Sequence, residues 1–385
     1  MKAVKYISLH EKSGYGIAAR RYITAIEKTG IPVTWTPMVP GTKWGLGYEL
    51  FEGRSVGDKV LDRVCNNQID YDTVIIHTVP EYYPLWKRRE IGKKVFGYSV
   101  WETDRIPRHW KPLLNCLDGL FVPCAWNKTV YKQCGVSVPI SVVPHIMSDE
   151  TLPPNRGFKN IPSEVYVFYT INTWTERKAI WNTIRCFLDT FTADDPVALI
   201  VKTTAKDFTR SRFDFFLNST RRAVRKLKRG YGKPARIHLI TQALPDKEML
   251  HLHARGDCYI SLCRSEGWGM GAFDAAGFGK PIIMTGFGGQ LDYLAADSSF
   301  LVDYHMIPVK DRAGKGSYST DQNWAEPDIA HASRLMKLVF DDQKTAQKKG
   351  LQLGGEIKRR FSRASISEEM IRCIINHKPT NAGIS

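Results

Sequence analysis

The sequence predicts an α/β protein built from two doubly wound, Rossmann-like parallel-sheet domains that face a central cleft. Short apolar runs alternate with stretches of helical spacing along most of the chain, which is the pattern of parallel strands covered by helices on both faces. The alternation stops at residues 149–162, which contain three prolines, and then restarts. The length of 385 residues is sufficient for two or three domains.

Each element expected in the first half follows from a local pattern. The strands are short runs rich in Val, Ile and aromatic residues, bounded by polar or turn-forming residues. Ser13 stands before the first stretch of helical spacing, where its hydroxyl can cap a helix. We expect strands at 3–9, 33–36, 73–78, 95–100, 119–123 and 140–143, and a first helix at 15–28.

A linker separates the two halves, because prolines, a glycine and polar residues gather at 149–162. We place a first domain at 1–150, the linker at 151–162, a second domain at 163–361, and a C-terminal helix and tail at 362–385 that packs back on the first domain. In the second half we expect strands at 165–171, 198–202, 237–241, 258–262 and 281–285, helices at 178–190, 214–229, 246–255, 270–278, 328–340, 345–361 and 366–376, and a loop at 308–324.

Composition limits the class of protein. The chain is 43% hydrophobic and 24% charged, which excludes a collagen-like, disordered or coiled-coil protein. Its apolar runs are shorter than the roughly eighteen residues of a membrane span, and residues 1–10 lack the pattern of a signal peptide. The eight cysteines include no CxxC pair, so we expect reduced thiols in a cytoplasmic protein.

Charge is the unusual property of this sequence. The formal net charge is +16, and such a surface attracts polyanions. The excess is concentrated between residues 202 and 236, where twelve Lys and Arg stand against Asp207 and Asp214. Within this segment, 213–229 has the spacing of an amphipathic helix with a basic outer face. Three interpretations stay open: a solvated surface helix, contact with an anionic membrane, and contact with DNA or RNA.

The loop Ser13-Gly14-Tyr15-Gly16 stands between a strand and a helix. Its backbone N–H groups can hold a phosphate at the positive end of that helix, and a plain tight turn is the alternative. A dinucleotide fingerprint would need a third glycine at the position of Ala19.

A second glycine-rich loop, 265–271, follows the expected strand 258–262 and opens another helix. The backbone amides there point toward a bound anion, and the glycines let a ligand approach the main chain. Glu266 can accept hydrogen bonds from sugar hydroxyls, or it only caps the helix. Asp274, eight residues further on, can accept hydrogen bonds from a ribose.

Three cations follow strands of the second half. Arg177 and Lys178 come after the strand 165–171, and Lys202 ends the strand 198–202. The carboxyl ends of parallel strands are where open sheets bind ligands. A helix terminus contributes only about 0.3–1 kcal/mol, up to ~2 kcal/mol when partly buried, so a diphosphate bound here needs fixed cations.

Together these segments resemble the group-1 family of retaining nucleotide-sugar glycosyltransferases, which has the GT-B fold. Residues 261–269 (SLCRSEGWG) resemble the family's strand and turn, and the spacing of Glu266 and Asp274 resembles its Glu-x7-Glu motif with Asp as the second member. Residues 279–289 (GKPIIMTGFGG) resemble the continuation of that motif. Three further segments resemble one subgroup of the family: 101–107 (WETDRIP), 142–145 (VVPH) and 324–328 (WAEPD).

The resemblance implies a nucleotide-diphosphate sugar as donor substrate, with a UDP-sugar as the first guess, and no separate cofactor. It implies that the second domain holds most of the donor. By position it assigns the diphosphate to Arg177, Lys178 and Lys202, the sugar to Glu266, the ribose to Asp274, further phosphate contacts to the amides of Gly269, Met270 and Gly271, and closure over the phosphates to Gly14 and Gly16.

Two departures from the family pattern matter. Asp274 is one methylene shorter than the usual Glu, which favours a weaker or water-bridged ribose contact. The family's histidine near the sugar has no clear counterpart, and His77 and Glu102, with Asp104 beside it, are the candidates on the acceptor side. The catalytic residues are therefore expected to be Glu266, Glu102 and Lys202.

The reaction that the resemblance implies transfers a hexose with retained configuration and without a metal ion. The acceptor is expected to be a glycan or a lipid-linked saccharide at the inner membrane surface. The basic residues 87–89 and 93–94 also allow sugar transfer onto a hydroxymethylated base of DNA. A non-catalytic nucleotide-sugar or polyanion-binding protein, and a phosphorylase or epimerase on the same fold, are the remaining alternatives.

Overall fold

The computed structural model describes residues 1–41, 47–155, 157, 161–210, 218–311 and 316–377. The chain forms two compact units. Unit 1 comprises residues 1–101, 105–148 and the C-terminal segment from Arg360, and unit 2 comprises residues 102–104 and 149–359. The short segment 102–104 therefore belongs to unit 2 although the chain on both sides of it belongs to unit 1.

Unit 1 contains a seven-stranded sheet in the order β3-β2-β1-β4-β5-β6-β7. Its strands are parallel except β3, which pairs antiparallel with β2 at one edge. The central strands are buried apolar runs such as VIIH in β4, as expected where helices cover both faces. The strands are β1 (Val4–Leu9), β2 (Val33–Pro40), β3 (Tyr48–Leu50), β4 (Thr73–His77), β5 (Lys94–Tyr98), β6 (Gly119–Val122) and β7 (Ile140–Val142).

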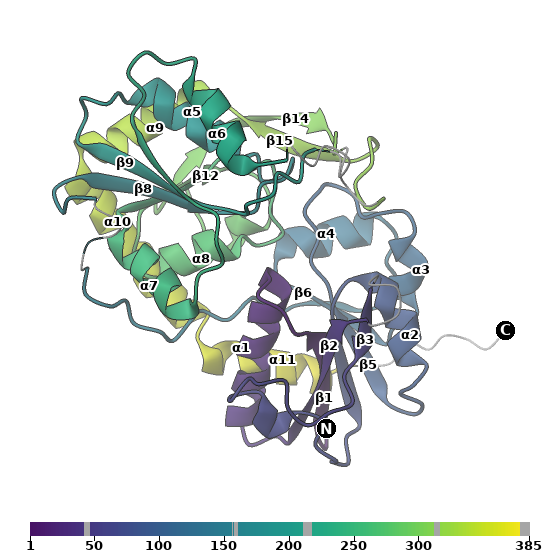
Figure 1. Cartoon of the computed structure of the whole chain (residues 1–385). Helices are drawn as coiled ribbons and strands as arrows, with labels where there is room; N and C mark the ends of the chain where they lie inside the picture. Colours follow the sequence, from purple (N-terminus) through teal and green to yellow (C-terminus); the bar gives the residue numbers. More distant parts are fainter. Residues whose placement is uncertain (42–46, 156, 158–160, 211–217, 312–315, 378–385) are drawn as a thin grey trace. The chain divides into compact units, whose positions relative to one another are not determined.

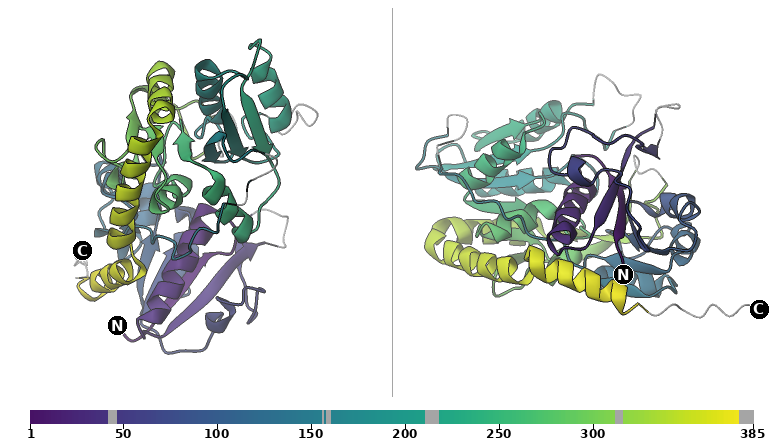
Figure 2. Two further views of the ribbon diagram at one scale, coloured as in Figure 1. Left: turned by 90° about the vertical axis from the view of Figure 1, so that its left-hand side faces the viewer. Right: turned by 90° about the horizontal axis from the view of Figure 1, so that it is seen from below.

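The helices of unit 1 come from both ends of the chain. Helix α1 (Gly14–Lys28) begins at an N-cap, because the Ser13 hydroxyl accepts a hydrogen bond from the Gly16 N–H. The C-terminal helix α11 (Arg363–Ile375) lies beside α1 (Figures 1 and 2), and Arg363 Nη1 donates to Thr24 Oγ1 at 3.0 Å. The other helices of unit 1 are α2 (Tyr83–Lys87), α3 (Trp110–Asn115) and α4 (Ala125–Gln133), with 3-10 turns at Asp62–Val64 and Pro80–Tyr82.

Unit 2 contains a six-stranded parallel sheet in the order β10-β9-β8-β11-β12-β13. The strands are β8 (Tyr166–Ile171), β9 (Val197–Lys202), β10 (Arg236–Ile240), β11 (Cys258–Ser261), β12 (Ile282–Thr285) and β13 (Phe300–Val302). A separate antiparallel hairpin joins β14 (Tyr304–Pro308) to β15 (Asn323–Pro327). The strand order reverses between β8 and β11, and such a switch point is where open α/β sheets bind ligands.

Helices cover both faces of this sheet. Figure 1 shows α5 (Ile180–Thr190), α6 (Thr220–Lys228) and α9 (Ile329–Asp341) on one face, and α7 (Asp246–Arg255), α8 (Met270–Gly277) and α10 (Gln343–Arg360) on the other. Helix α5 packs Ile180, Ile184 and Phe187, all at most 1% exposed, against the buried strands. Each such side chain contributes roughly 1.5–3 kcal/mol by leaving water. A 3-10 turn at Gly289–Asp292 follows β12.

The structure confirms the predicted fold class and most of the predicted elements. The prediction of a loop over 308–324 is wrong at its ends, because Pro308 belongs to β14 and Asn323 and Trp324 belong to β15. A hairpin that stands apart from the main sheet lacks the alternation with helices on which the prediction relied. The short strands β3 and β13 were also missed, because three residues are too few to form a recognisable pattern.

Three other expectations have structural counterparts. Of the expected basic helix 213–229, residues 213–217 lie outside the described part of the chain, and α6 covers Thr220–Lys228. The described residues of the linker 151–162 form no helix or strand. All eight cysteines are free thiols, five of them buried. Among the described helices, none combines the length and the apolar character needed to cross a membrane.

Candidate functional site

The candidate site lies in unit 2, at the carboxyl ends of the neighbouring strands β8 and β11. The chain leaves β8 through the loop that carries Arg177 and Lys178, and it leaves β11 through the loop that carries Glu266. The two loops meet directly, because the Arg264 N–H donates to the Arg177 carbonyl at 2.8 Å. The parallel pairing of β8 and β11 therefore brings together residues almost ninety positions apart in the sequence.

Glu266 is the centre of a buried ion-pair cluster and is 5% exposed. Arg177 Nη1 lies 3.2 Å from Glu266 Oε2 and donates to the Ser265 carbonyl at 2.9 Å. Lys178 Nζ hydrogen-bonds Glu266 Oε1. Arg177 Nη2 lies 3.2 Å from Glu102 Oε1. Two cations and two carboxylates thus share one enclosed space.

The cluster keeps Glu266 ionised. Burial raises the pKa of Glu266, but the charges and hydrogen bonds of Lys178 and Arg177 outweigh burial and hold that pKa below its ordinary value. A carboxylate held in this way can accept hydrogen bonds from ligand hydroxyls at any pH above its depressed pKa. The arrangement fits a role in binding a polyhydroxyl group, and it makes the alternative of simple helix capping weaker.

Hydrogen bonds to three other residues of unit 2 hold the segment 102–104 in place. The Ser265 hydroxyl donates to the Glu102 carbonyl, and Tyr318 Oη donates to Glu102 Oε2 at 3.0 Å. Both oxygens of Asp104 accept from Asn323, from its backbone N–H at 2.6 Å and from its Nδ2 at 2.9 Å. Glu102 is therefore part of the same cluster as Glu266, whereas Asp104 serves to hold its own segment against β15.

Arg264 holds the two site loops in place. Its Nη1 donates to Glu176 Oε2 at 2.9 Å, and its Nε donates to Glu326 Oε2 at 2.6 Å. Its guanidinium lies 5.6 Å from the ring centre of Trp181 and 5.3 Å from that of Trp324. A planar guanidinium can satisfy two carboxylates and two ring faces at once, which a lysine cannot.

Glycines and a tyrosine shape the backbone around Glu266. Gly288 has φ 109°, and a Cβ there would lie 2.6 Å from the Glu266 carbonyl oxygen, so only glycine fits this position. The Gly289 N–H donates to that same carbonyl at 2.8 Å. Tyr293 Oη donates to the carbonyls of Trp268 and Gly269 at 3.0 and 3.2 Å. The turn before α8 is consequently fixed from several sides.

Lys202 differs from the other cations of the site. It ends β9, and its Nζ contacts the Thr203 carbonyl at 3.3 Å. Among the described residues, it has no carboxylate within ion-pair distance, and burial lowers its pKa. A partly buried lysine without a counter-ion stabilises an incoming anion more than a cation that is already paired.

Helix α8 supplies the remaining predicted groups. It begins after Gly269, so the first-turn amides of Met270 and Gly271 have no acceptor within the helix. These amides are at the positive end of the helix dipole. Asp274 lies one turn further along and is half-buried.

The predicted residues of the first loop lie in unit 1. Gly14 is exposed and opens α1. A Cβ on Gly16 would lie 2.0 Å from the Glu11 carbonyl oxygen, so glycine is required here by the close approach of the loop backbone alone. This packing role is sufficient to explain Gly16 without a ligand.

His77 is enclosed in unit 1 by aromatic side chains. It is 0% exposed, and its Nδ1 lies 2.8 Å from Tyr6 Oη. Burial, with a smaller effect of His145, lowers the pKa of His77 well below its ordinary value, so the ring is neutral. Its Nε2 has no hydrogen-bond partner among the described residues. The enclosure favours the structural interpretation of this histidine.

The structure thus brings Glu102, Arg177, Lys178 and Glu266 into one cluster, and it places Lys202, Gly269, Met270, Gly271 and Asp274 in the same unit. Sequence reasoning missed Arg264, Tyr293 and Tyr318. Arg264 stands in the SLCRSEGWG segment, and its partners Glu326 and Trp324 stand in the WAEPD segment, so the motifs were a signal for it. The described residues contain no group of three or more His, Cys, Asp and Glu that could hold a metal ion.

Comparisons with known proteins agree with this geometry at the level of the fold. No protein-family model and no curated protein sequence matches the chain. Solved structures match over nearly its whole length. They include sucrose-phosphate synthase from Thermosynechococcus elongatus, with a TM-score of 0.68 at 11% identity, covering 97% of this chain and 98% of that chain. A glycosyltransferase from Rickettsia africae has a TM-score of 0.66 at 12% identity, covering 98% and 99%.

HepE from Anabaena, in complex with UDP and glucose, has a TM-score of 0.64 at 11% identity, covering 97% of this chain and all of that one. At identities this low, the likeness shows the fold alone: two parallel-sheet α/β domains of the GT-B class, as in these glycosyltransferases. Fold alone does not give activity, so the function has to be argued from the site.

Proposed function

We propose that this chain is a glycosyltransferase that moves a hexose from a nucleotide-diphosphate sugar to an acceptor hydroxyl with retained anomeric configuration. The observation that carries the proposal is the cluster at the switch point of unit 2. There an ionised, buried Glu266 stands beside Arg177 and Lys178, in a unit that also supplies the uncompensated Lys202 and the amino end of α8.

Charge determines the roles within this site. A departing nucleoside diphosphate carries at least two negative charges, and a helix terminus contributes only about 0.3–1 kcal/mol toward them. Among the described cations of the site, Lys202 is the one that is available without breaking an ion pair. Lys178 donates one of its three N–H groups to Glu266, so its other N–H groups can donate to the diphosphate.

Glu266 then holds the sugar. When donor hydroxyls hydrogen-bond to its carboxylate, they replace part of the interaction with Lys178 and Arg177. The bond between the anomeric carbon and the diphosphate breaks, the acceptor oxygen attacks from the same face, and the departing diphosphate accepts the acceptor proton. No metal ion or further cofactor takes part in the reaction that we propose.

UDP is the first nucleotide to test, because structures of the similarly folded HepE contain UDP with glucose and UDP-glucose. The test is a panel of UDP-, GDP- and ADP-sugars, with thermal stabilisation and release of the nucleoside diphosphate measured for each. A ligand at 100 times its Kd stabilises the folded state by about 2.7 kcal/mol. We expect one nucleotide class to stabilise the protein and to be hydrolysed slowly without acceptor.

Three outcomes separate the alternatives. Stabilisation without any turnover, with or without acceptors, would indicate a non-catalytic nucleotide-sugar-binding protein. Turnover that depends on inorganic phosphate would indicate a phosphorylase, and a changed donor sugar without transfer would indicate an epimerase. The absence of both stabilisation and release across the panel would refute the proposal.

The basic face of α6 bears on the acceptor. Six cations lie between Arg221 and Arg229, most of them exposed, and the helix TRRAVRKLK contains no acidic residue. Val224 is buried and anchors the helix. We propose that this face contacts an anionic membrane from the cytoplasmic side, where each such cation is worth about 1 kcal/mol, and that the acceptor is a glycan or a lipid-linked saccharide.

Sugar transfer onto a hydroxymethylated base of DNA would use the same charge and is the competing outcome. The two are distinguished by sedimentation with vesicles containing phosphatidylserine and by retardation of plain and hydroxymethylated DNA, each at low and high salt. A variant with Arg221→Gln and Arg225→Gln should lose binding to one of them, and Lys344→Gln with Lys348→Gln on α10 is the control. Binding that is insensitive to salt and to the α6 substitutions would leave α6 as a solvated surface helix.

A further inference from the structure

A basic turn with an exposed aliphatic residue connects α2 to β5 in unit 1, and the proposed transfer reaction does not use it. Ile91 in this turn is 88% exposed, and Leu85 on α2 is 44% exposed. Five cations lie within the same ten residues, 85–94, namely Lys87, Arg88, Arg89, Lys93 and Lys94. A single exposed aliphatic residue is common on protein surfaces, but the turn that carries this one is both fixed and charged.

The segment 83–91 has an inner and an outer face. Tyr83, Trp86 and Glu90 are at most 5% exposed, and their spacing of three and four residues places them on one side of a helical path. The path extends beyond α2, because the N–H groups of residues 89 and 90 donate to the carbonyls of residues 86 and 87 at 3.0 Å. Leu85 and Ile91 are left on the outer face.

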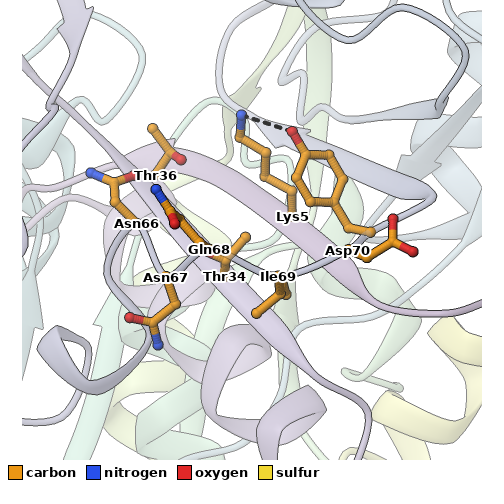
Figure 3. Close-up of a pocket in the computed structure, with 9 residues that line it drawn as sticks. Lys5, Thr34, Thr36, Asn66, Asn67, Gln68, Ile69 and Asp70 are labelled. Carbon is orange, nitrogen blue, oxygen red and sulfur yellow. Dashed lines mark hydrogen bonds between the residues drawn. The ribbon is translucent and has the colours of Figure 1, made fainter.

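Glu90 holds the turn from its inner side. Its Oε1 accepts from Lys5 Nζ at 2.6 Å, and its Oε2 accepts from Tyr71 Oη at 2.9 Å. Lys5, which lines the pocket drawn in Figure 3, also hydrogen-bonds that hydroxyl, as the dashed line there marks. Lys93 Nζ donates to the Tyr71 carbonyl at 2.6 Å. The one carboxylate of residues 85–94 is consequently buried and paired with Lys5.

The tip of the turn presents Ile91 in a fixed position. The Lys93 N–H donates to the Glu90 carbonyl at 3.2 Å, which closes a four-residue β-turn with Ile91 and Gly92 at its centre. Gly92 has φ 72°, the left-handed conformation that favours glycine at the third position of a type II turn. Because the backbone is already fixed, Ile91 can enter another surface with little loss of conformational entropy.

Three of the five cations are available to an anionic partner. Arg88, Arg89 and Lys94 are exposed, and none of them has an ion-pair partner in the described parts of the chain. Lys87, by contrast, lies 3.2 Å from Asp118 Oδ1. An anionic surface can therefore bind the three exposed cations without separating an existing ion pair.

The aliphatic residues favour a membrane as that partner. Single-stranded nucleic acid binds on aromatic rings, but Trp86 is buried, and the guanidinium of Arg89 lies 5.0 Å from the centre of its ring. A specific protein interface buries roughly 800 Å² on each partner, whereas the apolar part of this turn is two exposed aliphatic side chains. At an anionic membrane, aliphatic side chains enter the boundary of the acyl chains while cations bind the headgroups.

We propose that the turn 85–94 of unit 1 binds an anionic membrane, with Ile91 inserted between the lipid headgroups and the three exposed cations on the lipid phosphates. Insertion distinguishes this contact from the one proposed for α6. The large hydrophobic residues of α6, Val224 and Leu227, are buried and half-buried, so α6 offers charge alone.

This difference has a measurable consequence. Salt screens the attraction between charges, but it does not weaken the insertion of an apolar side chain. The turn therefore predicts membrane binding of which a part persists at high salt. The proposal rests neither on the transferase function nor on the α6 contact, because unit 1 binds the membrane whether or not unit 2 binds a nucleotide-sugar.

The test is sedimentation of the full chain with vesicles of phosphatidylcholine, with and without phosphatidylserine, at low and high salt. Ile91→Ser removes the apolar tip, and Ile91→Leu keeps it. Arg88→Gln with Lys94→Gln removes two exposed cations. The matched control is Leu338→Ser on α9, where the side chain is 54% exposed and the neighbouring Lys337 is already in an ion pair. These side chains are exposed, and a retained melting temperature confirms that each variant folds.

We expect the wild type to bind vesicles that contain phosphatidylserine and to keep part of that binding at high salt. Ile91→Ser should weaken the binding about tenfold at both salt concentrations. The double Gln variant should weaken it about twentyfold at low salt and much less at high salt, because salt screens the charges. Ile91→Leu and Leu338→Ser should stay within about twofold of the wild type.

Absence of binding to phosphatidylserine vesicles, or unchanged binding in both turn variants, would overturn the proposal. Binding of DNA but not of vesicles, weakened by the turn variants, would also overturn it. Loss of vesicle binding only in Arg221→Gln with Arg225→Gln would support the α6 contact and overturn this one, and loss only in the turn variants would do the reverse. Stabilisation by nucleotide-sugar is measured in parallel, and its absence would overturn only the proposed transferase function.

Discussion

Replacing Glu266 by Gln tests the ion-pair cluster most sharply. The substitution keeps the shape of the side chain and one acceptor oxygen but removes the charge that Arg177 and Lys178 share. The side chains involved are 7% exposed for Glu266, 16% for Arg177 and 15% for Lys178. Water can therefore do little to replace the lost partner.

The size of the expected destabilisation depends on the partners that the cations retain in the Glu266→Gln variant. Removing one partner of a buried ion pair typically costs about 3–5 kcal/mol, because the remaining charge is left uncompensated. Arg177 retains Glu102 at 3.2 Å and the Ser265 carbonyl at 2.9 Å, so we expect the lower limit, about 3 kcal/mol. For a unit of this size, 1 kcal/mol moves the melting temperature by about 2–4 °C. The expected decrease is then roughly 6–12 °C.

The effect depends on pH in a defined direction. The pKa of Glu266 in the folded protein is below its ordinary value, and the unfolded value is about 4.3. A group of this kind contributes its full stability above the unfolded pKa and loses it as the pH falls through the folded pKa. The difference in melting temperature between wild type and Glu266→Gln should thus be constant near neutral pH and should shrink below about pH 4.3.

The assay is thermal unfolding followed by fluorescence from pH 3.5 to pH 8, with Glu248→Gln as the control. Glu248 lies exposed in the first turn of α7, and its variant should melt within about 1 °C of the wild type. A Glu266→Gln protein that melts as the wild type does at neutral pH would refute the argument that the cluster is an enclosed, mutually dependent set of charges.

Three further predictions concern neighbouring features. Lys202→Met should leave the melting temperature at pH 7 unchanged or higher, because it removes a desolvated cation that has no carboxylate partner among the described residues. It should also abolish stabilisation by UDP, and unchanged stabilisation by UDP counts against the role of Lys202. Arg264→Lys should lower the free energy of unfolding by about 2–3 kcal/mol, because it breaks charge-assisted hydrogen bonds to Glu176 and Glu326. Urea unfolding measures this loss, with the exposed Arg334→Lys as the control. An equal loss in both variants would contradict the role of Arg264 in joining the two carboxylates. Gly16→Ala should destabilise unit 1, because the new Cβ would lie 2.0 Å from the Glu11 carbonyl oxygen. Gly355→Ala in α10, where the new Cβ meets open space, should instead stabilise the folded chain by about 0.5–1 kcal/mol. Calorimetric scans that show the same change in melting temperature for both variants would contradict the close packing at Gly16.

Local patterns were sufficient for much of the fold. The helix at Asp246–Arg255 has the predicted limits, because the preceding Pro245 and the following Gly256 are strong boundary signals. Helix α5 starts two residues later than predicted, since Ala179 has φ 39° in a left-handed conformation that no sequence pattern announces. The hairpin β14–β15 was missed because its strands pair only with each other.

The site was predictable in its members but not in its internal contacts. The positions of Arg177, Lys178 and Glu266 after neighbouring strands indicated that they would meet. Their neutralisation by each other and by Glu102 depends on side-chain conformations, which sequence spacing does not encode.

The most direct measurement of the central claim is a crystal structure of the chain with a non-hydrolysable nucleotide-sugar. The account predicts diphosphate oxygens within hydrogen-bond distance of Lys202 Nζ and of the first amides of α8, with a sugar hydroxyl on the carboxylate of Glu266. A nucleotide-sugar bound elsewhere, with Lys178 still paired to Glu266 and no ligand beside Lys202, would contradict it.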